Sequence, residues 1–134
     1  MNSPKHLRHK PIISVNEYDK IDGQYRDNTD VKALSIGLAQ YDSTEISLKI
    51  WRHTGNKWSR QSEELPLHRT IDLNILLIAS LLTDTTSAYP SCNLREEIDE
   101  ISDVGLIKSY YKSNEHFLRP RLEELKDKLD EFLK

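Results

Sequence analysis

Apolar residues alternate with small or polar ones along two neighbouring stretches in the first half of the chain. A period of two predicts β-strands, because successive side chains of a strand point to opposite faces. Three apolar residues of each stretch therefore share a face: Leu34, Ile36 and Leu38 in one, and Ile46, Leu48 and Ile50 in the other. The intervening residues of the first stretch (Ser35, Gly37 and Ala39) are small, which predicts that another backbone or a helix approaches closely there.

A third strand is predicted over residues 57–62. Gly55-Asn56 is a typical two-residue hairpin turn, so the chain should return antiparallel after it. The predicted cross-strand pairs are Thr54 with Lys57, His53 with Trp58, Trp51 with Arg60, and Lys49 with Ser62. A shift of one residue would exchange the two faces.

Helices are predicted in the second half of the chain. Residues 71–82 are apolar almost all round, which is typical of a buried helix, and Pro66 stands near its start. Residues 94–101 have the spacing of a short amphipathic helix. Spacings of four and three predict another helix with one apolar stripe, formed by Leu118, Leu122, Leu125, Leu129 and Phe132. The fold class is α+β: an antiparallel β-meander of about three strands packed on a buried helix, with further C-terminal helices.

Length and composition indicate one small domain in a reducing compartment. The 134 residues suit a single domain, with residues 1–11 as a possible mobile basic arm. Cys92 is the one cysteine, and the apolar runs are too short to span a bilayer. With a net charge of −3, the chain has no global attraction for a phosphate backbone. We therefore expect a cytoplasmic protein that has neither a membrane nor a nucleic acid as its partner.

Aromatic and basic side chains gather on one face of the predicted hairpin. An indole ring can stack on a nucleobase, and an arginine can hold a phosphate with two hydrogen bonds. The candidate ligand-binding residues are Lys49, Trp51, Arg52, His53, Trp58, Arg60, His68 and Arg69. The alternative is that Trp51 and Trp58 simply cover the second face of the sheet.

Motifs for catalysis are largely missing. The sequence has no His-Glu-x-x-His, no glycine-rich phosphate loop and no Gly-x-Ser-x-Gly. A hydrolase using His53 and His68 with Glu63 or Glu64 is the weaker hypothesis, and it requires these groups to converge. We expect no catalytic residue, no metal and no cofactor.

Several short strings together resemble a small bacterial family of unassigned function. The strings are Trp51-Arg52-His53-Thr54 and residues 57–69 (KWSRQSEELPLHR), with His9-Lys10-Pro11, residues 20–23 and residues 28–30 as further similarity. The resemblance covers about residues 5–83 and implies no activity.

Two functions remain. The first is binding or sequestration of an anionic small molecule, with a nucleotide or nucleotide-derived signal preferred, as in a sponge or sensor of phage–host conflict. The second is a protein-interaction or inhibitor module that contacts a protein partner or a second copy through the hairpin aromatics or the stripe from Leu118 to Phe132. A pocket walled by the N-terminal arm would favour the first, and a flat exposed patch the second.

Overall fold

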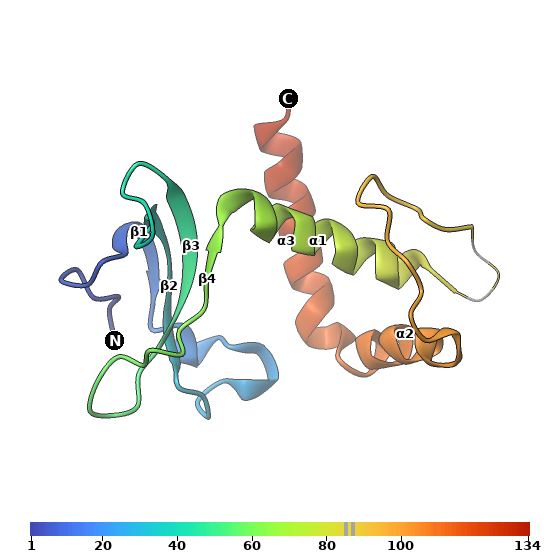
Figure 1. The fold of residues 1–134 in the computed structure, drawn as a ribbon. Helices are drawn as coiled ribbons and strands as arrows, with labels where there is room; N and C mark the ends of the chain where they lie inside the picture. The colour runs from blue at the N-terminus through green and yellow to red at the C-terminus, as the bar shows by residue number, and fades with distance from the viewer. Residues whose placement is uncertain (85, 87) are drawn as a thin grey trace. The chain divides into compact units, whose positions relative to one another are not determined.

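The computed structural model describes residues 1–84, 86 and 88–134 and confirms the α+β class. Its elements, in chain order, are β1 (Lys10–Asn16), β2 (Val31–Leu38), β3 (Ile46–Arg52), β4 (Glu64–Pro66), α1 (Leu67–Leu82), α2 (Val104–Ser113) and α3 (Glu115–Phe132) (Figure 1). Short 3₁₀ turns at Tyr18–Lys20 and Gly23–Tyr25 connect β1 to β2, and another at Ile101–Asp103 precedes α2. The chain divides into two compact units, Met1–Asp72 and Leu73–Lys134, which are described in turn.

The first unit is built on a four-stranded antiparallel sheet in the order β1-β2-β3-β4. Two predicted strands are confirmed within β2 and β3, and β1 adds a strand at the edge. The predicted return strand over residues 57–62 is wrong beyond the His53–Trp58 pair. The Ser62 hydroxyl accepts the Arg52 amide at 2.9 Å, so a side chain takes the place of the ladder there.

Beyond the His53–Trp58 pair, the register is two residues later than predicted. Lys49 pairs with Glu64 instead of with Ser62. Because side chains alternate with a period of two, a shift of two residues keeps every side chain on its predicted face. Lys49, Trp51 and His53 therefore still share one face of the sheet.

The face of β2 that carries small side chains is the buried one. Ala33 is 0% exposed and Ser35 is 6% exposed, whereas the larger Leu34 and Ile36 on the other face are half-buried. The predicted close approach occurs at Gly37, where an added Cβ would lie 2.0 Å from the Lys10 carbonyl oxygen. The backbone of β1 therefore occupies the space that a side chain at position 37 would need.

Replacing Gly37 with alanine should destabilise the protein by about 1–3 kcal/mol, because the methyl group forces the β1 backbone away. The matched control is Gly105→Ala in α2, where an added Cβ has no neighbour within 4 Å. This control should gain about 0.5–1 kcal/mol from alanine's higher helix propensity. Urea unfolding measures both, and an unchanged Gly37→Ala variant would contradict the β1–β2 register.

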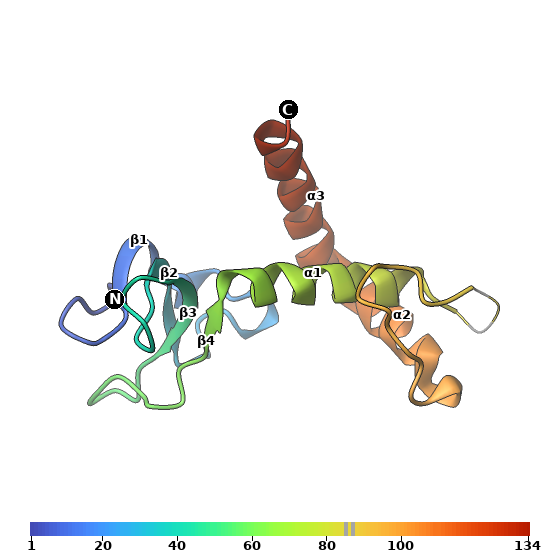
Figure 2. The ribbon, with the colours of Figure 1, turned by 45° about the horizontal axis from the view of Figure 1, so that its top comes forward.

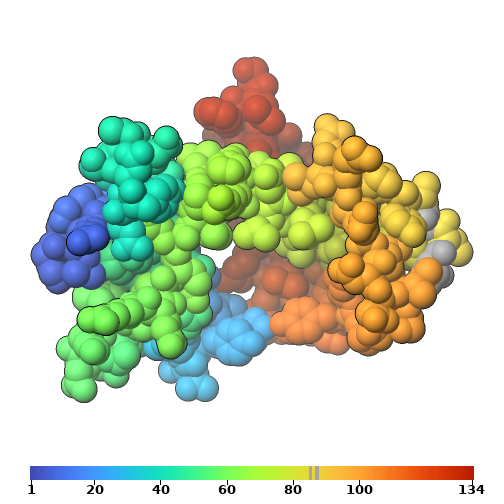
Figure 3. All heavy atoms as spheres, viewed as in Figure 1, coloured from blue at the N-terminus to red at the C-terminus, as the bar shows by residue number. Residues whose placement is uncertain are grey.

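The N-terminal segment is attached to the sheet at two points, although its composition alone predicts a mobile arm. The Ser3 amide donates to Asn16 Oδ1 at 2.8 Å, and the hydroxyls of Ser3 and Ser14 are 2.6 Å apart. At the other end His9 is 0% exposed. Between these anchors lie residues 4–8, which we call the arm loop; the N-terminal segment is the blue part of Figure 3.

Helix α1 is present as predicted, but its predicted burial is wrong. Ile71, Leu73 and Ile75 are 53%, 52% and 40% exposed, and Ala79 is the buried residue of this helix. A helix that is apolar all round becomes buried only where a further layer covers each of its faces. Of the α1 residues named here, Ala79 alone is buried.

In the second unit, the helix predicted over residues 94–101 is wrong. Arg95 adopts a left-handed conformation (φ 60°), which interrupts a helix. The Glu96 carboxylate accepts the amides of Ser91 and Cys92 at 2.8 and 3.1 Å, which closes a loop instead. The Ser91 hydroxyl also donates to this carboxylate. This hydrogen bond has the largest effect, and together with the amide bonds it lowers the pKa of Glu96 to about 2.

The C-terminal helix is confirmed as α3, and it follows α2 through a bend at Asn114 that both ribbon views show (Figures 1 and 2). Its apolar stripe is only partly covered. Leu129 is 47% exposed and Phe132 is 84% exposed.

Candidate functional site

Four of the eight predicted ligand-binding residues lie together at the hairpin end of the sheet. The rings of Trp51 and Trp58 are 5.7 Å apart and those of His53 and Trp58 are 4.9 Å apart, both edge to face. The Lys49 ammonium lies 4.3 Å from the centre of the Trp51 ring. The chain thus forms a continuous aromatic and cationic cluster from β3 into the hairpin loop.

The inner half of this cluster is part of the core. Trp51 is 1% exposed, and its indole N–H donates to the Ser35 hydroxyl at 2.8 Å. The Lys49 side chain is 9% exposed and lies 3.5 Å from the Glu64 carboxylate. In this structure Trp51 therefore covers the face of the sheet, and it cannot stack on a ligand that arrives from solvent.

His9 is the centre of a buried polar network beneath the tryptophans. Its Nδ1 is 2.9 Å from the Ser47 hydroxyl, and its Nε2 is 2.9 Å from the Ser35 hydroxyl. Ser47 in turn donates to Glu64 Oε2 at 3.0 Å. The network connects the residue preceding β1 with β2, β3 and β4, so it holds the four strands and the arm loop together.

This network has a structural role because it is buried, although its serine, histidine and glutamate are residue types that also occur in catalytic sites. His9 and Ser47 are 0% exposed, so no substrate can reach them. Burial lowers the pKa of His9, against the opposing pull of the Glu64 carboxylate, and Lys49 lowers it further. His9 is accordingly a neutral imidazole that forms hydrogen bonds through both of its ring nitrogens.

The outer half of the cluster borders a pocket of about 340 Å³ between the arm loop and the hairpin loop. We call this cavity the hairpin pocket. Its lining residues are His6, Leu7, His53, Asn56, Lys57 and Trp58. The ionisable residues among them are all basic, and Trp58 is half-buried.

Local hydrogen bonds fix the shape of the hairpin side of this pocket. Thr54 and Lys57 pair through the backbone at 2.9 Å, as the hairpin turn predicts. The Gly55 amide donates to His53 Nδ1 at 3.0 Å, and Gly55 has a φ of 101°, which glycine adopts without strain. With Nδ1 accepting this bond, a neutral His53 carries its proton on Nε2.

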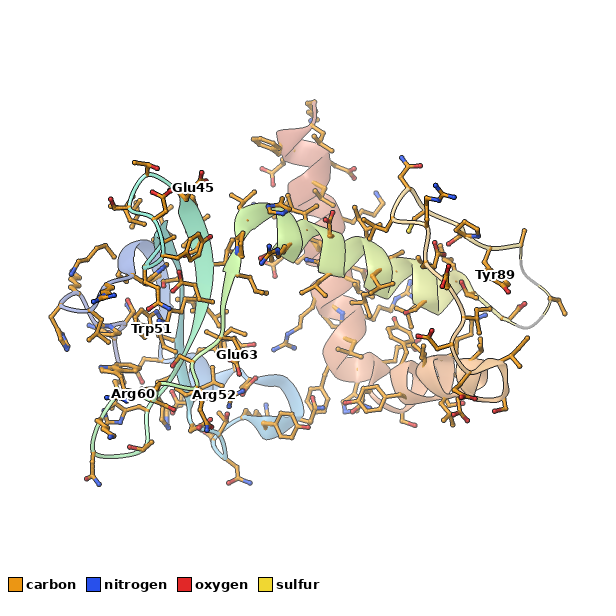
Figure 4. The ribbon with its side chains drawn as sticks, viewed as in Figure 1. Glu45, Trp51, Arg52, Arg60, Glu63 and Tyr89 are labelled. Atoms are coloured by element: carbon orange, nitrogen blue, oxygen red, sulfur yellow. The ribbon has the colours of Figure 1, made fainter. Side chains whose placement is uncertain are left out.

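Arg52 is placed elsewhere, at a second cavity of the first unit. Its guanidinium contacts Asp30 at 2.6 Å and Glu63 at 3.0 Å, and the hydrogen bond to Asp30 is the main cause that raises the pKa of Arg52. Figure 4 shows Arg52 beside Glu63, with Arg60 in the loop that follows β3. The cavity measures about 590 Å³ and is lined by Tyr18, Asp22, Tyr25, Asn28, Thr29, Asp30, Val31, Leu34, Ile50 and Arg52.

The remaining three predicted residues do not line the hairpin pocket. Arg60 is exposed in a turn, and His68 and Arg69 are exposed in the first turn of α1. Conversely, sequence reasoning did not assign His6, Leu7, Asn56 or Lys57 to a site. The small side chains of β2 signalled the close approach of β1 at Gly37, but no sequence signal placed His6 and Leu7 beside the hairpin.

Within the described residues, no cluster of three or more His, Cys, Asp or Glu side chains is arranged to hold a metal ion. Within the same residues, no helix has both the length and the apolar character that crossing a membrane requires.

Fold and pocket together define a small α+β protein with a basic, aromatic-lined cavity. The chain belongs to DUF6530, a family of unknown function whose model matches residues 1–97. This match confirms the resemblance to a small family of unassigned function. No match was found among curated proteins or among solved structures.

Proposed function

We propose that this protein binds an anionic small molecule in the hairpin pocket, with a nucleotide or nucleotide-derived signal as the preferred ligand. The observation that carries the proposal is that the arm loop forms one wall of the pocket and the hairpin loop forms the other. Binding or sequestration of a ligand uses such a concave site, whereas a protein-interaction module uses a flatter exposed patch.

The lining residues suit a ligand that combines a flat ring with negative charge. The half-buried Trp58 ring lines the pocket and would offer a stacking surface, and its position is supported by edge-to-face contacts with Trp51 and His53. His6 and Lys57 approach from opposite walls and can donate to a phosphate or carboxylate. A volume of about 340 Å³ is at the small end for ligand sites, which favours one ring system with its anionic group.

The hydrolase alternative receives no comparable support. Glu63 contacts Arg52, and Glu64 contacts Ser47 and Lys49, so both carboxylates have other partners. Their geometry gives no reason to assign a reaction to His53 or His68.

Trp58→Ala should weaken ligand binding while the fold remains intact, because Trp58 lines the pocket and is only half-buried. A stacked base contributes roughly 1–3 kcal/mol, so the dissociation constant should rise by about 5- to 150-fold. Isothermal titration calorimetry measures the change. The matched control is Tyr25→Ala, an exposed aromatic residue of the other cavity, and equal losses in both variants would contradict this location of the site.

The ligand itself is found by thermal shift of the purified protein against mono-, di- and cyclic nucleotides and dinucleotide-derived signals. A ligand at 100 times its dissociation constant adds about 2.7 kcal/mol, which should raise the midpoint by about 5 to 10 °C. A selective shift that Trp58→Ala abolishes supports the proposal. A panel without any shift overturns it and favours the protein-interaction function instead.

A further inference from the structure

We propose that two copies of the chain associate through their second units, with the apolar stripe of α3 from each copy seated in a groove of the other. This inference is independent of ligand binding in the first unit. It rests on two surfaces of residues 73–134 that are complementary in both polarity and charge.

The first surface is a cavity of about 700 Å³ formed by α1, α2 and the residues preceding α2, which we call the acidic groove. Its lining is largely apolar and includes Leu73, Leu76, Leu77, Leu106 and Ile107. Every ionisable residue among its described lining residues is acidic: Glu96, Glu97, Asp99, Glu100 and Asp103.

The second surface is the stripe of α3, defined above as Leu118, Leu122, Leu125, Leu129 and Phe132. Its C-terminal half is open to solvent, with Leu125, Leu129 and Phe132 at 36%, 47% and 84% exposed. From Leu118 to Phe132 the stripe extends about 21 Å at the rise of an α-helix. An apolar stripe of this kind is the typical ligand of a hydrophobic groove.

The flanks of the stripe carry only positive charge. In a helix with this heptad spacing, the positions beside the seam are Arg119, Arg121, Lys126 and Lys128. Beyond Leu118, the acidic residues of α3 (Glu123, Glu124, Asp127, Asp130 and Glu131) lie on the other side. The stripe is therefore apolar with basic flanks, and the groove combines an apolar lining with acidic residues.

Charge distinguishes this arrangement from a simple pairing of two α3 helices. In a coiled coil of α3 with its own copy, the basic flanks would face one another in either orientation, which is unfavourable. Seated in the acidic groove, the same flanks meet carboxylates. The ion pairs that now occupy the flanks, such as Lys126 with Asp130 and Lys128 with Glu131, lie within the exposed helix and are weak enough to be exchanged.

A reciprocal contact of this kind gives a closed assembly, which cannot add further copies. Each copy supplies one stripe and one groove, so two copies related by a two-fold axis use both surfaces and leave neither open. The expected assembly is a dimer.

Two charge-reversal variants of the full chain test the proposal. One is Lys126→Glu with Lys128→Glu, which makes the stripe edge acidic, and the other is Glu97→Lys with Glu100→Lys, which makes the groove edge basic. Each variant alone should dimerise more weakly than the native chain, on the order of tenfold or more, because like charges meet. Sedimentation equilibrium measures the dissociation constant of each.

Mixing the two variants should restore the dimer. The acidic stripe of one then meets the basic groove of the other, and the native stripe meets the native groove in the second contact. A matched control with the same change in charge, Lys112→Glu with Lys134→Glu, alters positions outside the groove lining and the stripe flanks and should dimerise like the native chain.

Three results would overturn the proposal. A native chain that is monomeric at every concentration tested would exclude the dimer. Tighter association of Lys126→Glu with Lys128→Glu would indicate pairing of two α3 helices. Failure of the mixture to dimerise, while circular dichroism shows both variants folded, would show that the stripe and the groove do not meet.

Discussion

Replacing Trp51 with alanine is expected to lower the free energy of unfolding by about 3–5 kcal/mol. The indole is 1% exposed and lies between His9 and Trp58, with Lys49 4.3 Å above its ring centre. Alanine would leave a cavity and would also remove the donor that the Ser35 hydroxyl accepts. Because a small protein has only about 5–15 kcal/mol of stability in total, this one change should bring the fold close to its limit.

Urea unfolding followed by circular dichroism measures this loss, with Trp58→Ala as the matched control. Trp58 is half-buried, so its removal should cost clearly less than the removal of Trp51. Trp51→Phe should fall between the two, since it keeps most of the apolar volume but loses the hydrogen bond to Ser35. Equal stability of Trp51→Ala and Trp58→Ala would contradict the deeper burial of Trp51 in the structure.

His9→Ala is expected to lower stability by about 2–4 kcal/mol, the second largest effect. The substitution removes two buried hydrogen bonds, to Ser35 and to Ser47, and leaves a cavity where the ring was. His6→Ala is the matched control from the same segment. His6 is exposed, so its replacement should change stability by no more than about 0.5 kcal/mol.

The pH dependence of stability gives a second test of His9. Burial lowers the pKa of His9 below its ordinary value of 6.5, so the unfolded chain binds a proton at a higher pH than the folded chain does. Stability rises with pH wherever the unfolded state binds more protons. The native protein should therefore lose stability as the pH falls through 6.5 toward the lower pKa of the folded state.

His9→Ala should show a smaller loss of stability over the same pH range, because the group responsible is gone. His6→Ala should keep the native pH dependence. A native-like pH profile in His9→Ala would mean that His9 is not the buried neutral histidine of the network.

The strands of the sheet could be predicted because their pattern is local. A period of two located β2 and β3, and it also gave the correct faces of Lys49, Trp51 and His53. The pairing of β3 with its return strand was wrong by two residues, since Ser62 replaces a ladder hydrogen bond with its side chain. The faces survived this error because two is the period of a strand.

The remaining errors of prediction come from contacts that the spacing of apolar residues does not reveal. Residues 94–101 have helical spacing, yet Glu96 binds the backbone of Ser91 and Cys92 and closes a loop. The hairpin pocket was only half predictable for a similar reason. His53 and Trp58 are on the hairpin, whereas His6 and Leu7 come from a segment more than 40 residues earlier in the chain.

The two anchors of the arm loop affect the entropy of ligand binding. A wall made by a free chain end would have to be ordered by the ligand, at a cost of roughly 1–2 kcal/mol for each residue fixed. Here Ser3 and His9 restrict residues 4–8 before any ligand arrives. The arm loop is therefore largely ordered when the sheet folds, before the ligand binds. Because little further ordering is needed, the interactions of the ligand with His6 and Leu7 contribute to affinity almost in full.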